Sequence, residues 1–182
     1  MRFLCLLLLL LSLPLSSAHS QAQLDTAKKY LGTTELTNHN DGPVVEKFLH
    51  SVGRHKGDSW CAAFVSYCLT AASVKEPTVR SGLARSFILK SSIKANDVLI
   101  GKYKIQPGTI LVWREGTTIH GHVGFVESWQ RQFGKTIEGN TTPSSSLRSS
   151  LSEANGDGVY RKSRSIQPGN YFRITNFTLV KN

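Results

Sequence analysis

The chain has 182 residues, a formal net charge of +10 and a composition that is 40% hydrophobic. That length fits one domain with room for a proper hydrophobic core. The sequence shows no internal repeat and no clean domain boundary, so we expect a single domain.

The N-terminal segment predicts a signal peptide over residues 1–22. Arg2 supplies a short basic region, Leu4 to Leu11 is a nearly unbroken apolar run, and small residues place cleavage after Ala18 or Ala22. The apolar run is too short to span a bilayer comfortably, which favours cleavage over an N-terminal membrane anchor. We therefore expect a secreted or periplasmic protein that meets a membrane only through this signal peptide.

Residues 23–182 form the expected mature chain, a single domain. Cleavage removes one basic and no acidic residue, which lowers the net charge to +9. A basic exported protein is expected to adhere to anionic polymers, such as cell-wall polymers, lipopolysaccharide or nucleic acid. Charge alone does not choose among these polymers, and it serves solubility equally well.

Two short helices are predicted before the first cysteine of the mature chain. Residues 23–31 have helical spacing of apolar side chains, with Gly32 as a stop. Pro43 fits the first position of a second helix, 44–52, which Gly53 ends.

The next segment, GDSWCAAFVSYCL from Gly57 to Leu69, is the most informative part of the chain. It predicts an apolar helix over residues 59–72, with Asp58 or Ser59 as N-cap. Cys61 then falls at the second or third helical position. There the unpaired N–H groups and the helix dipole favour a negative charge, and thiolates at helix N-termini have lowered pKa values. This position is typical of a nucleophile.

The mature chain keeps two cysteines, Cys61 and Cys68, because Cys5 leaves with the signal peptide. Seven helical positions separate them by about 10 Å, whereas a disulfide needs Cα atoms within about 7 Å. Cys68 lies deeper in the helix and is most simply a core residue. An unpaired cysteine in an oxidising compartment is a liability unless it has a use, which again favours a catalytic Cys61.

The second half of the chain predicts strands, after a short helix at 86–90. The strands are expected at 109–114, at 122–129, from 136–138, at 159–164 and at 171–180. A long surface loop is expected over 141–157. Helices followed by strands predict an α+β fold, with N-terminal helices packed on a mainly antiparallel sheet.

A cysteine nucleophile needs a base, and the base needs a group that orients it. His122 is the leading base because it stands at the start of a predicted strand, flanked by Gly121 and followed by Gly124. His120 lies in the preceding loop and is the weaker candidate.

Two residues of the next strand compete for the orienting role. Glu138 and Asn140 stand at i and i+2 and share one face of the strand. Either could accept a hydrogen bond from Nδ1 of His122, which would leave Nε2 facing the sulfur. Both could equally be ordinary turn residues, because a loop opens at Asn140.

Four blocks in this order resemble the CHAP family, the cysteine/histidine-dependent amidohydrolases and peptidases. They are WCAAFVSYCL (60–69), IQPGTILVWREG (105–116), GHVGFVES (121–128) and IEGNT (137–141). The resemblance covers roughly Ala27 to Arg164. It implies a papain-like fold related to the NlpC-type wall peptidases. It also implies cleavage of peptidoglycan, either at the amide between muramic acid and the stem peptide or within the peptide.

The resemblance assigns roles residue by residue. Cys61 matches the nucleophile, His122 the base, Glu138 the acidic residue and Asn140 the asparagine two positions later. The expected substrate-binding residues at the mouth of the cleft are Asp58, Trp60 and Gly121. The chain departs from the family in having Thr109 after Pro-Gly, a long loop at 142–157, and no wall-anchoring repeat.

The expected partner is therefore peptidoglycan, bound by a monomer without cofactor. Two other functions use the same sequence features. One is a secreted papain-like protease acting on proteins, and the other is a wall-binding module without catalysis. The second should have lost its nucleophile or base, yet both Cys61 and His122 are present.

Metal and nucleic-acid sites have little support in the sequence. His120, His122 and Cys61 could be drawn as a zinc set, but no carboxylate pattern completes it. The basic residues are scattered, with one small cluster at 161–164, and no nucleic-acid recognition motif is present.

Overall fold

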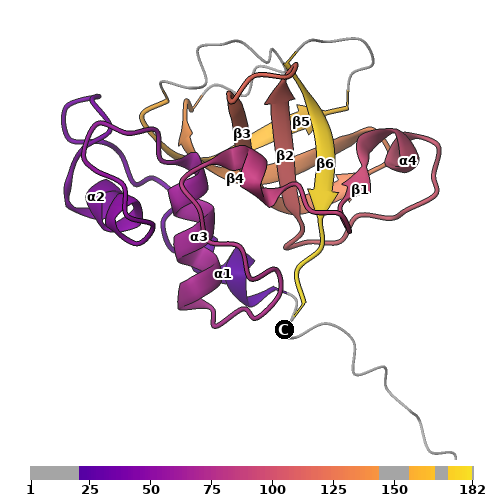
Figure 1. Cartoon of the computed structure of the whole chain (residues 1–182), viewed down its shortest axis with the longest axis horizontal. Coiled ribbons are helices and arrows are strands. Elements are labelled where there is room, and N and C mark those ends of the chain that lie inside the picture. Colours follow the sequence, from indigo (N-terminus) through magenta and orange to yellow (C-terminus); the bar gives the residue numbers. More distant parts are fainter. Residues whose placement is uncertain (1–20, 144–155, 167–171, 182) are drawn as a thin grey trace, which may run out of the picture.

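Three helices, within residues 22–71, precede all the strands along the chain and lie together beside the sheet, whereas a short helix at 95–99 lies at the other side of it (Figure 1). The computed structural model describes residues 21–143, 156–166 and 172–181. The predicted signal peptide, apart from its last two residues, and most of the loop expected at 141–157 lie outside the described residues.

The described helices are short. They are α1 (Ala22–Lys28), α2 (Pro43–His50), α3 (Cys61–Ala71), the 3-10 helix η1 (Ala84–Phe87) and α4 (Ala95–Leu99). Pro43 occupies the start of α2, as its fixed φ angle predicts. Within the described part of the chain, no helix is long and apolar enough to cross a bilayer.

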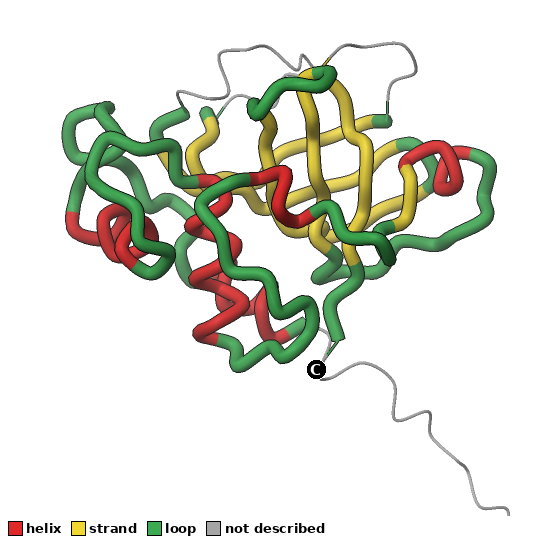
Figure 2. The backbone as a smooth tube through the Cα atoms, viewed as in Figure 1, coloured by secondary structure: helices red, strands yellow, loops and turns green. Residues whose placement is uncertain are grey.

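The strands form one antiparallel sheet, drawn in yellow in Figure 2. They are β1 (Ile93–Lys94), β2 (Ile110–Glu115), β3 (Gly121–Gln130), β4 (Phe133–Thr141), β5 (Gly158–Ser165) and β6 (Phe172–Thr178). Their order across the sheet is β1-β6-β2-β3-β4-β5, and every neighbouring pair is antiparallel. The α+β prediction is confirmed.

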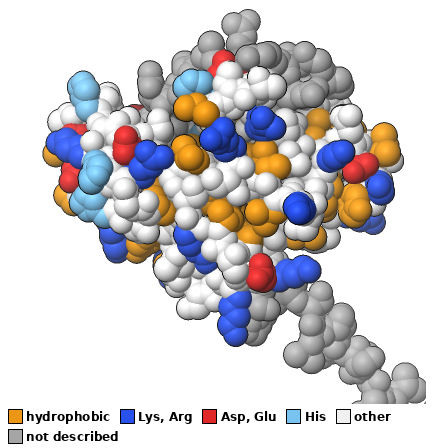
Figure 3. Space-filling view, viewed as in Figure 1, with side chains coloured by type: hydrophobic (Ala, Val, Ile, Leu, Met, Phe, Trp, Pro, Cys, Tyr) orange, Lys and Arg blue, Asp and Glu red, His pale blue; other side chains and the backbone are white. Residues whose placement is uncertain are grey.

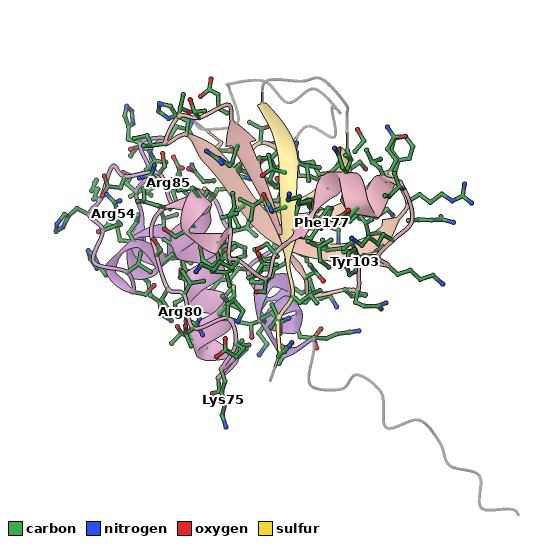
Figure 4. The ribbon with its side chains drawn as sticks, turned by 45° about the vertical axis from the view of Figure 1, so that its right-hand side comes forward. Arg54, Lys75, Arg80, Arg85, Tyr103 and Phe177 are labelled. Atoms are coloured by element: carbon green, nitrogen blue, oxygen red, sulfur yellow. The ribbon has the colours of Figure 1, made fainter. Side chains whose placement is uncertain are left out.

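Two hydrophobic clusters cover opposite faces of this sheet. Residues alternate along β2: Ile110 and Val112 face the cluster that contains α3, whereas Leu111 and Trp113 face the cluster that contains Val98 of α4. Figure 4 shows Phe177 of β6 and Tyr103 on the side of the molecule that carries α4. Arg54, Arg80 and Arg85 lie on the side that carries α3.

Helix α3 is central to the first cluster and packs against β3 and β4. Most of its residues are buried, including Cys61, Phe64 and Cys68. Phe64 meets Phe125 of β3 edge to face, with ring centroids 6.5 Å apart. This packing fixes the start of α3 relative to the two strands that carry His122 and Glu138.

Three expectations about elements need correction. Helix α3 begins at Cys61 rather than at residue 59. The short helix expected at 86–90 is the 3-10 helix η1, which begins two residues earlier and ends three residues earlier. Strand β1 and helix α4 were not predicted, because two and five residues are too few to show a hydrophobic period.

Candidate functional site

The imidazole of His122 and the carboxylate of Glu138 are in direct contact. His122 is the second residue of β3, and Glu138 lies on the neighbouring β4. Nε2 of His122 lies 3.1 Å from Oε2 of Glu138. Both side chains are buried, so this contact is shielded from water and salt.

Cys61 stands at the first position of α3 and completes a set of three. No side chain caps this helix, and its first intrahelical bond runs from the amide of Phe64 to the carbonyl of Trp60. The amide N–H groups at the first three positions, Cys61 included, therefore have no acceptor within the helix. An anion at this helix end is stabilised by those groups and by the helix dipole.

The pKa of His122 reports how these groups act on one another. Burial by itself lowers the pKa of the imidazole, but attraction to Cys61 and Glu138 outweighs burial and raises the pKa to about 10. Hydrogen bonds to both partners contribute to this rise. His122 is thus held as an imidazolium between a sulfur and a carboxylate, the charge state that supports a cysteine nucleophile.

The ring nitrogens have the opposite roles from those expected. The sequence analysis assigned Nδ1 to the orienting carboxylate, yet the structure uses Nε2 for Glu138. Nδ1 is therefore the nitrogen left for Cys61. The reason is the path of the chain, because the side chain of His122 extends from β3 toward β4 and presents its far end to Glu138.

A fourth residue, Arg164 of β5, binds Glu138 with two donors and was missed by the sequence analysis. Its Nε lies 2.8 Å from Oε1 of Glu138, and one terminal nitrogen donates to Oε2. The hydroxyl of Thr136 also donates to Oε1. Burial by itself raises the pKa of Glu138, but Arg164 and then His122 outweigh it and hold that pKa well below its usual range.

Asn140 does not orient His122. Its side-chain oxygen accepts from the amide of Trp60 at 3.2 Å, and its side-chain nitrogen donates to Asn40 at 3.0 Å and to the carbonyl of Gly156 at 2.8 Å. Asn140 thus ties β4 to the residue directly before Cys61, and its contact with the site is indirect. Of the two competing residues, Glu138 is the one that contacts the imidazole of His122.

Trp60 is fully buried, which corrects its assignment to the mouth of the cleft. Its ring stacks on Phe48 with centroids 5.9 Å apart, and its Nε1 donates to Glu35 at 2.8 Å. Gly139 makes this possible, because a Cβ added there would lie 2.7 Å from the indole ring. Trp60 is a core residue that anchors the start of α3.

Asp58 does not cap α3, and its carboxylate contacts the turn that precedes the helix. Its Oδ2 accepts from the backbone of His55 at 3.1 Å and lies 3.9 Å from a terminal nitrogen of Arg54. Its side chain is 40% exposed. Asp58 therefore remains available at the surface beside the start of α3, but as a turn residue.

Gly121 and Gly124, on either side of His122, occupy positions where a side chain would collide with different neighbours. A Cβ at Gly121 would lie 2.6 Å from the carbonyl oxygen of Trp113 on β2. A Cβ at Gly124 would lie 2.6 Å from Cγ of Glu138. Gly121 allows the strands to approach, and Gly124 provides the space that Glu138 occupies.

The small basic cluster at 161–164 is divided by the alternation of β5. Arg161 is exposed and pairs with Glu127 at 2.9 Å, whereas Lys162 and Arg164 are buried. No basic patch forms there, and Figure 3 shows Lys and Arg side chains scattered over the visible face. His120 is exposed whereas His122 is buried, so the zinc site drawn from His120, His122 and Cys61 does not form. No group of three or more candidate metal ligands occurs among the described residues.

Residues 53–140 match the family model of the CHAP domain. Cys61, His122, Glu138 and Asn140 all lie inside the matched segment, whereas Arg164 lies beyond it. No significant match was found among curated proteins or among solved structures. The order of the motifs, the buried Cys–His–Glu set and the antiparallel α+β architecture agree with this match, and the chain therefore carries a domain of the CHAP family.

Proposed function

We propose that this protein is an exported cysteine hydrolase that cleaves amide bonds of peptidoglycan. The observation that carries the proposal is the buried contact of His122 with Glu138 beside Cys61 at a helix start. CHAP domains are hydrolases of the amidase or peptidase type. A cysteine, a histidine and a carboxylate in contact support hydrolysis of an amide by a cysteine nucleophile.

Reaction begins with the Cys61 thiolate, which attacks the carbonyl carbon of the scissile amide. A carbon–sulfur bond forms, and the carbonyl π electrons move to oxygen. The unpaired N–H of Cys61 at the start of α3 is suited to receive that oxyanion. Preorganised donors of this kind act strongly because they need no reorganisation during the reaction.

Collapse of the tetrahedral intermediate breaks the carbon–nitrogen bond. His122 delivers its proton to the departing amine, which leaves a thioester on Cys61. His122, now neutral, accepts a proton from water as the water attacks the thioester, and the sulfur departs as a thiolate. Glu138 stays ionised throughout, because its contacts with Arg164 stabilise the charged form.

Peptidoglycan is the favoured substrate because of the family match together with the predicted signal peptide and the basic charge. An exported enzyme with net positive charge is attracted to anionic wall polymers.

Digestion of purified sacculi, followed by mass spectrometry of the soluble products, tests this proposal. A new free amine on the first stem alanine identifies an amidase, and a new amine within the stem identifies an endopeptidase. A casein digest under the same conditions is the matched comparison. Cleavage of casein with intact sacculi would replace the proposal by a protein-directed protease.

A further inference from the structure

Arg164 has a role in the catalytic set that neither the sequence motifs nor the family match assigns. We propose that Arg164 is a positioning residue of the reaction, which holds Glu138 in place and ionised behind His122. The inference concerns the proposed cysteine site and therefore rests partly on the proposed function.

The first argument is the geometry of the ion pair. Nε of Arg164 bonds to one carboxylate oxygen of Glu138, and a terminal nitrogen bonds to the other. A planar guanidinium with two parallel donors fixes the plane and direction of a carboxylate, which a single-point ammonium does not. The oxygen that receives the terminal nitrogen, Oε2, is also the one that contacts Nε2 of His122.

The second argument is burial. The side chain of Glu138 is 0% exposed and that of Arg164 is 3% exposed. A carboxylate removed from water takes up a proton unless charge or hydrogen bonds compensate. Arg164 provides the largest compensation, ahead of His122. Without it, Glu138 would become a poor acceptor for the imidazolium.

The third argument is a stacked contact with Trp113 of β2. The guanidinium carbon of Arg164 lies 4.8 Å from the centroid of the Trp113 ring, and the centroids of Trp113 and His122 are 5.2 Å apart. The indole therefore contacts both ends of the His122–Glu138–Arg164 series. Four strands, β2, β3, β4 and β5, must keep their register for this arrangement to form.

The test measures alkylation of Cys61 by iodoacetamide as a function of pH, so it needs no substrate and stays interpretable if peptidoglycan is not cleaved. Arg164→Gln is expected to slow Cys61 alkylation at pH 7 by about tenfold or more, as His122 loses its charged support. Arg164→Lys keeps the charge but loses the two-donor geometry. Its alkylation rate is expected to lie between those of wild type and Arg164→Gln. Cys68 serves as an internal control, because burial raises its pKa well above the ordinary value and it reacts only on unfolding.

A double-mutant cycle separates positioning from general destabilisation. In the Glu138→Gln background, adding Arg164→Gln should leave the alkylation rate and its pH profile unchanged, because Arg164 acts through Glu138. This comparison decides the matter even if the single variant Arg164→Gln does not fold. The proposal is overturned if Arg164→Gln keeps the wild-type profile while folded. It is equally overturned if adding Arg164→Gln to Glu138→Gln lowers the alkylation rate of Cys61 by the same factor as it does in the wild-type background.

Discussion

Nε2 of His122 and Oε2 of Glu138 lie 3.1 Å apart in a region closed to water. This contact decides which of two nearby polar residues stands behind the histidine, and it leaves Nδ1 for the sulfur of Cys61. It also links the protonation of the base to the charge of its neighbours, which gives the site measurable consequences.

The pH dependence of hydrolysis should report His122. Its pKa is raised to about 10, so the imidazolium that protonates the leaving amine persists up to that pH. We expect the rate to fall on the basic side with a midpoint near pH 10. Glu138→Gln removes one of the attractions that raise this pKa, so the midpoint should move to lower pH and the rate at pH 7 should fall by about 10²–10⁴-fold. A basic midpoint that Glu138→Gln leaves in place would contradict this assignment.

Substitution of Asn140 should lower the stability of the fold. It should leave the pH at which the rate falls on the basic side (the basic midpoint) unchanged. Asn140→Gly removes its hydrogen bonds to Trp60 and Asn40 while suiting the backbone, whose φ angle is 56°. We expect a loss of about 1–3 kcal/mol in the free energy of unfolding, measured in urea. Asn140→Ala should lose roughly 1–2 kcal/mol more because its Cβ disfavours this φ. A shift of the pH midpoint comparable to that of Glu138→Gln would show that Asn140 acts on the base after all.

Trp60 offers a direct check on its reassignment from the cleft to the core. Trp60→Phe keeps an aromatic ring against Phe48 but loses the bond from Nε1 to Glu35. The free energy of unfolding should fall by about 1–3 kcal/mol, with KM for soluble muropeptides unchanged. A raised KM with unchanged stability would return Trp60 to the substrate-binding surface.

Gly124 should be intolerant of any side chain because of Glu138. The added methyl group of Gly124→Ala would meet Cγ of Glu138 at 2.6 Å and the carbonyl oxygen of Ile137 at 3.0 Å. We expect the carboxylate to be displaced, with a fall in rate and a basic midpoint moved in the same direction as in Glu138→Gln.

The matched control for Gly124→Ala is Val123→Ala, one position earlier on β3. Val123 belongs to the α3-side cluster, on the opposite face of the sheet from His122. This variant should lower the free energy of unfolding without moving the basic midpoint. If both variants act alike on the pH profile, the steric account of Gly124 is wrong.

The sequence could single out Cys61, His122 and Glu138 as candidates for nucleophile, base and acid because each lies in a recognisable local pattern. Cys61 lies at the start of an apolar helix, His122 lies at the start of a strand, and Glu138 lies in the next strand. The side-chain cap predicted for the helix is not formed. The family resemblance, now confirmed by the domain match, reinforced all three. Local patterns also placed the larger helices and strands, since hydrophobic period is strongest in long elements.

Other features depend on three-dimensional pairing that a sequence does not display. Arg164 looked like part of a basic surface cluster, because only the pairing of β4 with β5 brings it to Glu138. The burial of Trp60 could not be foreseen, since α3 is apolar on nearly all sides and its pattern does not reveal which neighbours cover its start. The choice between ring nitrogens likewise depends on the direction in which His122 leaves β3.

The central claim is that Cys61 is the nucleophile of a peptidoglycan hydrolase, and the most direct test compares two cysteine variants in one assay. Cys68 lies in the same helix and is buried in the core, where burial raises the pKa of its thiol well above the ordinary value. Release of soluble fragments from purified sacculi should be abolished by Cys61→Ala and retained by Cys68→Ala, with both proteins folded by circular dichroism. Fragment release by folded Cys61→Ala at the wild-type rate would contradict the account.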